Sequence, residues 1–402
     1  MGAEMTEAGI TTIIDNTTYD QHLYDNPGYL DASAFGRALD YVAGDGNNNF
    51  IGTNFDDTIS GGGGNDSLGG NGGDDVVNGG SGIDTLSGGD GDDVVIGGGG
   101  NDFVYGNDGA DTLTGDEGDD IITGGLGADL MTGGIGNDTY YADLSDTIIE
   151  NAGEGTDTVY MNGTYTLSDV LENLVLTGSG NFNGTGNSGN NSITGNSGDN
   201  ILDGGAGADT MSGGLGADIY IVDNSADIVS EAGYDGKFDE IRASASFTVN
   251  NLAVEQLTLT GSGNINGTGN SAANIILGNV GDNHITGLGG ADMLTGGGGS
   301  DVFVYSNVAD STSAARDTIT DFQSGDKIDL SAIDANYNTP ANEAFTYVGS
   351  AAFSHTAGEL RVYTSGTEWI VEADRDGDGA ADMTIGGTID SGYVPTAADF
   401  VF

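Results

Sequence analysis

The chain has 402 residues, with 75 glycines, no cysteine, and 63 acidic against 7 basic residues, so its formal net charge is −56. This charge excludes nucleic acid and anionic lipid as partners over most of the surface, because their phosphates would be repelled. The lack of cysteine excludes disulfides and thiolate metal sites, so hard cations are the first partners to consider.

The N-terminal segment, residues 1–43, precedes a region of short repeats and is expected to cap the first coil that these repeats form. It contains one predicted helix, DASAFGRALDYV, at residues 31–42. The segment has no basic stretch and no apolar run of signal-peptide length. No stretch of the chain approaches the roughly 18 apolar residues of a membrane span. We therefore expect no transmembrane segment, and an export signal, if there is one, must lie elsewhere.

Residues 44–142 contain a repeat of nine residues, in which a glycine-rich turn is followed by an aspartate, any residue and an apolar residue. We interpret each unit as a six-residue turn and a three-residue strand. The aspartates are Asp57, Asp66, Asp75, Asp84, Asp93, Asp102, Asp111, Asp120, Asp129 and Asp138.

A short, fixed period predicts a solenoid, because no single unit can bury its apolar residue alone. Three residues of strand span about 10 Å, so the next strand must return on the opposite face, and two units make one coil. Stacked coils then form two parallel sheets, and alternate aspartates fall in two columns. Coils about 4.8 Å apart bring like charges together, at a cost of about 3 to 4 kcal/mol per pair at a protein surface.

A cation between successive coils would remove this repulsion. The available ligands are hard oxygens, which favours calcium over zinc or copper, and calcium tolerates a more flexible shell than magnesium. The structural alternative is that each aspartate only caps its turn through Asx hydrogen bonds. Ten aspartates in one register favour the cation, and we expect multiple Ca²⁺ ions.

The units GGSGIDTLS (residues 79–87) and GGLGADLMT (residues 124–132) resemble the calcium-binding nonapeptide of the RTX, or hemolysin-type, family. The resemblance implies a parallel β-roll with calcium between its turns, and it gives the ten aspartates the role of ion ligands. Thr53 and Phe55 replace glycines before Asp57, Asn71 replaces one before Asp75, and Asp116 replaces one before Asp120. The sites at the start of the roll are the least certain.

The chain contains an internal duplication, and each of its two copies includes one further predicted RTX block. These blocks are residues 184–222 and 267–305. Their metal candidates are Asp209, Asp218, Asp292 and Asp301. The partners one coil earlier are asparagines, for which we expect weaker or empty ion sites and a hydrogen-bonded ladder: Asn191, Asn200, Asn274 and Asn283. The intervening residues 143–183 and 223–266 alternate apolar and polar side chains, which predicts strands laid beside the roll.

The C-terminal region, residues 306–402, is similar to the segment that closes the roll in serralysin-type metalloproteases and related RTX proteins. The last residues, Asp399, Phe400, Val401 and Phe402, resemble the end of a type I secretion substrate, with an ordinary final strand as the alternative. The run from Asp374 to Asp382 begins like an EF-hand loop, but Ile385 stands at the twelfth position where glutamate is required. An acidic hairpin therefore competes with an ion site there.

No HExxH motif, nucleophile elbow or Walker A loop occurs, so the protease activity of serralysins does not carry over and we expect no enzyme. The fold class is all-β: a parallel β-roll in several blocks with β-rich insertions and a β-rich C-terminal cap. We expect an extracellular or cell-surface bacterial protein, exported by type I machinery and folded by calcium, that serves as a scaffold, surface layer, matrix component or adhesin. It would associate with itself or with surface polysaccharide. The alternative is the RTX carrier or polysaccharide-binding module of a secreted hydrolase, lyase or epimerase.

Overall fold

The computed structural model describes Thr11–Thr12, His22–Tyr24 and residues 29–402, except 232, 234, 340, 390 and 391. Two compact units are present. The first contains residues 1–178 and 182–193, and the second contains residues 179–181 and 194–402.

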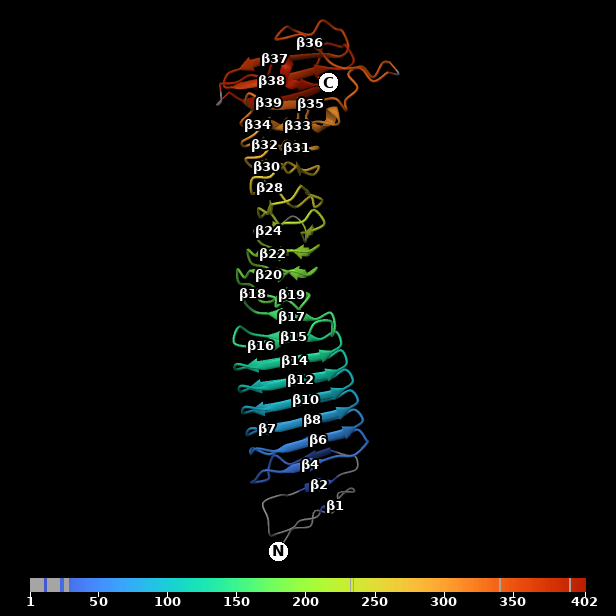
Figure 1. Ribbon diagram of the computed structural model, residues 1–402, viewed down its shortest axis with the longest axis vertical. Coiled ribbons are helices and arrows are strands. Elements are labelled where there is room, and N and C mark those ends of the chain that lie inside the picture. Colours follow the sequence, from blue (N-terminus) through green and yellow to red (C-terminus); the bar gives the residue numbers. More distant parts are fainter. Residues whose placement is uncertain are drawn as a thin grey trace. The chain divides into compact units, whose positions relative to one another are not determined.

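The first unit is a parallel β-roll in which strands alternate between two sheets (Figure 1). One sheet has the order β1-β2-β4-β6-β8-β10-β12-β14-β16, and the other runs from β3 through the odd-numbered strands to β19. The strands of the N-terminal part are β1 (Thr11–Thr12), β2 (His22–Tyr24), β3 (Tyr29–Asp31), β4 (Asp40–Val42), β5 (Asn49–Ile51), β6 (Thr58–Gly63), β7 (Ser67–Gly72), β8 (Val76–Ser81), β9 (Thr85–Asp90), β10 (Val94–Gly99), β11 (Phe103–Asp108), β12 (Thr112–Glu117), β13 (Ile121–Leu126) and β14 (Leu130–Ile135). They are followed by β15 (Thr139–Ala142), β16 (Thr147–Ile149), β17 (Thr158–Met161), β18 (Tyr165–Thr166), β19 (Asn173–Leu176), β20 (Gly184–Asn187) and β21 (Ser192–Thr194).

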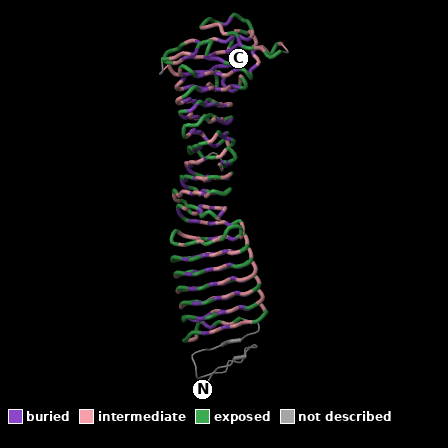
Figure 2. The backbone as a smooth tube through the Cα atoms, viewed as in Figure 1, coloured by how far each residue is buried: buried purple, intermediate pink, exposed green. Residues whose placement is uncertain are grey.

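The core of this roll is one apolar side chain per repeat. Val95 pairs with Val77 and with Leu113 in the neighbouring coils, and all three side chains are fully buried. In the first four residues of each strand from β6 to β14, buried residues alternate with exposed or half-buried ones (Figure 2). The two-unit coil and the parallel sheets expected from the repeat are therefore confirmed.

The strands of the main roll are longer than expected. We predicted three residues, whereas β6 to β14 each have six, because pairing resumes on the far side of a bend in each strand. The first residue after the break in pairing has a positive φ, such as Gly80 at 105°. Asn71 at 86° and Asp116 at 78° take the same conformation, which asparagine and aspartate tolerate better than most residues. These two departures from glycine therefore leave the turn intact.

The predicted helix at residues 31–42 is wrong. Its last residues form β4, which pairs in parallel with β2 and β6, and the segment before it is a turn. Tyr41 is buried and stacks on Phe50, so the stacked coils already include this segment. Most of residues 1–28, to which we assigned a capping role, lie outside the described residues.

The insertions do not lie beside the roll as expected. β16 pairs in parallel with β14, and β17 pairs with β15 and β19. Tyr140 pairs in register with Val159, Val159 pairs with Leu174, and all three are buried, so residues 143–178 form further coils of the same stack. Residues 223–266 behave in the same way in the second unit, where β26 pairs in parallel with β24 and β28.

The second unit also stacks parallel strands, in the orders β22-β24-β26-β28-β30-β32-β34 and β27-β29-β31-β33-β35-β40. Its first strands are β22 (Ile201–Gly205), β23 (Thr210–Ser212), β24 (Ile219–Val222), β25 (Ile228–Ser230), β26 (Glu240–Ala243), β27 (Phe247–Thr248), β28 (Gln256–Leu259), β29 (Gly267–Thr268), β30 (Ile275–Leu277), β31 (His284–Thr286), β32 (Met293–Thr295) and β33 (Val302–Val304). The rest are β34 (Thr318–Ile319), β35 (Lys327–Asp329), β36 (Thr346–Tyr347), β37 (Glu359–Ser365), β38 (Glu368–Asp374), β39 (Met383–Thr388) and β40 (Phe400–Val401), with the 3₁₀ helices η1 (Val308–Asp310) and η2 (Ala397–Asp399).

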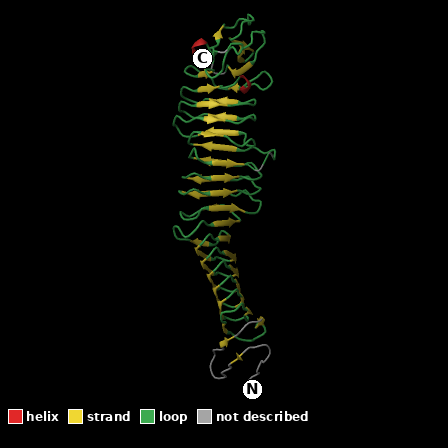
Figure 3. Ribbon diagram, turned by 90° about the vertical axis from the view of Figure 1, so that its right-hand side faces the viewer, coloured by secondary structure: helices red, strands yellow, loops and turns green. Residues whose placement is uncertain are grey.

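The C-terminal region ends this stack with antiparallel strands. β39 pairs in parallel with β34, and β38 and β37 follow in antiparallel pairs. The fully buried Trp369 packs edge-on against Phe322. In the described part of the chain the helices are short 3₁₀ turns (Figure 3), and none has the length and apolar character required to cross a membrane. The all-β class is therefore confirmed.

Candidate metal columns

The ten aspartates of the main roll form the two expected columns, and each column is linked by hydrogen bonds between coils. The backbone N–H of Asp75 donates to Oδ1 of Asp93 at 2.7 Å, and the N–H of Asp93 donates to Oδ1 of Asp111 at 2.8 Å. The other column repeats the contact from Asp84 to Asp102, at 2.7 Å. Each carboxylate is therefore held by the preceding coil.

The second carboxylate oxygen, Oδ2, is buried and has no hydrogen-bond partner in nine of the ten aspartates. Their side chains are at most 3% exposed. A buried acceptor without a partner costs about 1–3 kcal/mol, and more when it is charged. The nine are Asp66, Asp75, Asp84, Asp93, Asp102, Asp111, Asp120, Asp129 and Asp138.

Glycine makes the space in which these oxygens lie. A Cβ atom added to Gly97 would lie 2.6 Å from Oδ2 of Asp102 and 2.7 Å from the carbonyl oxygen of Gly115. The unpartnered carboxylate oxygen and a carbonyl of the next coil thus converge on one point beside the glycine backbone. Two oxygens that face each other without a proton between them are suited to a cation.

Burial makes the charged form of these carboxylates costly. It raises the pKa of Asp75 and Asp120 to about 7, with further contributions from neighbouring aspartates. The pKa of Asp84 and Asp93 rises to about 6 for the same first reason. A bound cation would favour the charged form and remove this penalty.

The residues fit calcium. The oxygens are hard donors from carboxylates and carbonyls, and calcium accepts six to eight such ligands in flexible geometry. Asp57 is the exception in the first block: its Oδ2 accepts the backbone N–H of Thr53 at 2.6 Å. Thr53 occupies the position at which later repeats have positive φ and lacks that conformation itself, so its amide points at the carboxylate. Asp57 therefore lacks the unpartnered oxygen of the other nine aspartates, and a weaker ion site at the start of the roll stays a prediction.

Asparagines in the second and third blocks form the expected ladder. Oδ1 of Asn283 accepts the N–H of Asn279 at 2.9 Å within its own turn, and Nδ2 donates to the carbonyl oxygen of Ile265 at 2.6 Å in the preceding coil. Asn274 makes the same two kinds of bond. The aspartates that follow them resemble those of the first block, because Oδ2 is buried without a hydrogen-bond partner in Asp218, Asp292 and Asp301.

The columns extend past the residues identified by sequence. Oδ1 of Asp157 accepts the N–H of Asp138, and Oδ1 of Asp146 accepts the N–H of Asp129. The sequence signal for these residues is the triplet of aspartate, any residue and an apolar residue, which persists without the glycine-rich turn. In the second unit the same contacts are made by Asp227, Asp239, Asp317 and Asp326.

The run from Asp374 to Asp382 is a hairpin between β38 and β39. Both oxygens of the buried Asp374 accept backbone N–H groups, from Gly377 at 2.7 Å and Gly379 at 2.9 Å. Asp374, Asp376 and Asp382 lie close enough to share an ion, but amides of the loop already bond to the carboxylates.

The C-terminal residues form an ordered strand. β40 pairs in parallel with β35, Phe400 is buried, and Lys327 forms an ion pair with Asp399 at 3.6 Å. The alternative of a final strand is therefore present in the fold. The role in type I secretion stays a prediction.

Comparison with known families agrees with this geometry. One family model, which describes four copies of the RTX calcium-binding nonapeptide repeat, matches the chain in five segments. These are residues 42–77, 69–104, 105–140, 185–220 and 268–303. A search of curated proteins finds no match. The family model does not extend into residues 306–402, so the resemblance of that region to serralysins stays a prediction. The chain therefore contains RTX calcium-binding nonapeptide repeats, and these repeats form a parallel β-roll.

Proposed function

We propose that the protein is exported by a type I system, folds when it meets extracellular calcium, and acts without catalysis as a scaffold, matrix component or adhesin. The supporting observation is the row of nine buried Oδ2 atoms without hydrogen-bond partners. These atoms would be held at a cost in a calcium-poor cytosol and would become ligands outside the cell.

Linkage gives this proposal its physical basis. A ligand that binds only the folded chain stabilises it, by about 4.1 kcal/mol when its free concentration is 1,000 times its dissociation constant. With a formal net charge of −56, the chain repels itself without calcium, so it can remain extended during export. Calcium then supplies both the ligand and the counter-charge.

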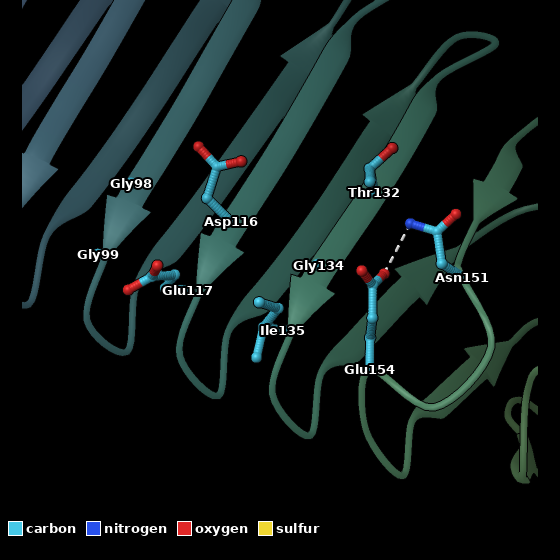
Figure 4. Close-up of a pocket in the computed structure, with 9 residues that line it drawn as sticks. All are labelled: Gly98, Gly99, Asp116, Glu117, Thr132, Gly134, Ile135, Asn151 and Glu154. Carbon is cyan, nitrogen blue, oxygen red and sulfur yellow. Dashed lines mark hydrogen bonds between the residues drawn. The ribbon is translucent and has the colours of Figure 1, made fainter.

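The scaffold role is supported by the regularity of the columns. Nine of the ten aspartates of the main roll share one arrangement, with Oδ2 buried and without a hydrogen-bond partner, whereas paired catalytic carboxylates require unequal environments. A shallow depression beside β10, β12 and β14 is lined by Asp116, Glu117 and Thr132, among others (Figure 4). Its side chains are mainly acidic or small.

The test is electron microscopy with light scattering of the full chain during a calcium titration. We expect ordered polymers at millimolar calcium. We also expect that the protein neither cleaves nor modifies any polysaccharide tested with it. A monodisperse monomer at millimolar calcium would contradict the scaffold role, and turnover of a polysaccharide would favour the enzyme-module alternative.

A further inference from the structure

Two matched groups of carboxylates lie where the first and second RTX blocks end. Asp138 and Asp157 gather with Glu150, and Asp218 and Asp239 gather with Glu231. In each group the three residues offer ligand oxygens that lie within 4.8 Å of one another. The glutamates come from the loops after the repeats, outside the nonapeptide pattern.

The glutamate replaces a backbone ligand of the repeat. Inside the roll, a Cβ on Gly115 would meet Oδ2 of Asp120 and the carbonyl oxygen of Gly133 in the next coil. At Gly133 itself, the hydroxyl oxygen of Tyr140 and Oε1 of Glu150 take the place of that carbonyl oxygen, beside Oδ2 of Asp138. At Gly213, Oε1 of Glu231 stands in the same place beside Oδ2 of Asp218.

Unpartnered oxygens point into both groups. Oδ2 of Asp138, whose side chain is 1% exposed, and Oε2 of Glu150 have no hydrogen-bond partner. Oδ2 of the fully buried Asp218 has none either. A third carboxylate in such a place increases the repulsion instead of relieving it, unless a cation is bound.

We propose that each group binds one Ca²⁺ ion through its two aspartates and its glutamate, and that these two sites close the ends of the RTX blocks. Calcium–oxygen distances are about 2.3–2.6 Å, so two ligands of one ion lie at most about 5 Å apart. The separation of up to 4.8 Å is within this limit. The inference goes beyond the repeat sites, because the glutamate is the defining ligand.

A tyrosine positions each glutamate. The hydroxyl of Tyr140 donates to Oε1 of Glu150, and that of Tyr220 donates to Oε1 of Glu231. Burial raises the pKa of both phenols, so they remain protonated donors. Oε2 of Glu150 is thereby left to face the ion.

The end of the third block lacks this arrangement among the described residues. There, Oδ1 of Asp321 accepts the N–H of Gly296 at 2.8 Å and Oδ2 accepts the N–H of Gly297 at 2.7 Å. Both oxygens of this carboxylate are used by amides. Oε1 of Glu150 also accepts an amide, the N–H of Gly133 at 3.0 Å, but its Oε2 has no hydrogen-bond partner. A carboxylate oxygen that can face a cation is therefore present at Glu150 and not at Asp321.

The test is crystallography of the full chain grown with CaCl₂, using the anomalous signal of calcium, for the wild type and for Glu150→Gln. We expect anomalous peaks between the three carboxylates of both groups in the wild type. Glu150→Gln keeps the size and the acceptor for Tyr140, and it should remove the first peak and leave the peak beside Glu231. The matched control is Glu154→Gln in the same loop, where the side chain of Glu154 accepts from Asn151 at 2.8 Å (Figure 4) and both peaks should persist.

The wild-type map alone can overturn the inference. Filled repeat columns with no peak at either glutamate would refute the two terminal sites and leave the calcium-folding proposal standing. Empty repeat columns together with empty terminal sites would refute both. Loss of the first peak in Glu154→Gln would also contradict the assignment of Glu150 as the ligand.

Discussion

Asp93 donates its backbone N–H to Oδ1 of Asp111 across 2.8 Å, and Oδ2 of Asp111 is left buried without a hydrogen-bond partner. One oxygen of each carboxylate thus joins coil to coil, and the other requires a ligand from outside the chain. The repeat builds its scaffold and its metal sites from a single residue.

Replacing Asp93 by asparagine should separate these two roles. The amide oxygen can still accept the N–H of Asp75, and the amide nitrogen would replace the unpartnered Oδ2 with an uncharged group that cannot bind a cation. We expect the calcium concentration at the folding midpoint to rise about tenfold, which corresponds to about 1.4 kcal/mol. A calcium titration followed by circular dichroism measures it.

Asp108→Asn is the matched control for this change, because Asp108 is an exposed residue at the end of β11. Its midpoint should stay within a factor of about two of the wild type, since exposed charge changes have small effects. Equal shifts in both variants would show that net charge, and not the column, sets the calcium requirement.

Gly97→Ala should damage one site by sterics alone. The added methyl group would lie 2.6 Å from Oδ2 of Asp102 and 2.7 Å from the carbonyl oxygen of Gly115. Overpacking of this kind costs about 1–3 kcal/mol, so we expect a lower calcium affinity and a lower Tm in calcium. Differential scanning calorimetry reports the second effect.

The control is Gly99→Ala, two residues along the same strand. A Cβ there meets nothing within 4 Å, and the residue has no positive φ. Its Tm should match the wild type. A loss as large as that of Gly97→Ala would show that alanine disturbs the turn and not the ion position.

Acid should stabilise the metal-depleted roll. Burial raises the pKa of Asp75 and Asp120 to about 7 in the folded chain, from an ordinary value of 3.8. Between these pH values the folded chain holds protons that the unfolded chain has released, so the free energy of unfolding falls as pH rises from about 4 to about 7. Circular dichroism of the metal-depleted chain from about pH 7 to about pH 4 measures this effect, as a β signal that increases on acidification.

Calcium should reverse the pH dependence. Protons compete for the ligands, so the stabilisation that calcium adds must decrease on acidification through the raised pKa values of about 6 to 7. The free energy of unfolding of the metal-depleted chain should not rise with pH over this range. Such a rise would contradict the inference that the carboxylates are buried without a compensating charge.

The sequence predicts the roll well because the repeat has a fixed period of nine residues and each repeat contributes one apolar residue to the core. The aspartate register alone predicted the two columns, and the asparagines at four matching positions predicted the ladder. Thr53 indicated that the turn before Asp57 departs from the later ones, because a β-branched residue resists the positive φ that glycine adopts freely.

Other features depend on contacts between residues that are distant in the sequence, and the sequence pattern did not predict them. The helix expected at residues 31–42 failed because Tyr41 is buried as a strand residue and stacks on Phe50, a tertiary contact that local pattern does not contain. Glu150 and Glu231 escaped notice because their loops interrupt the period of nine, and only stacking brings them beside Asp138 and Asp218.

The most direct test of the central claim is far-ultraviolet circular dichroism of the full chain at neutral pH, first in excess EGTA and then with calcium restored. The account predicts a largely unordered spectrum in EGTA and recovery of the β signal with calcium, because the buried Oδ2 atoms of the columns then gain a ligand. An identical β spectrum under both conditions would contradict it.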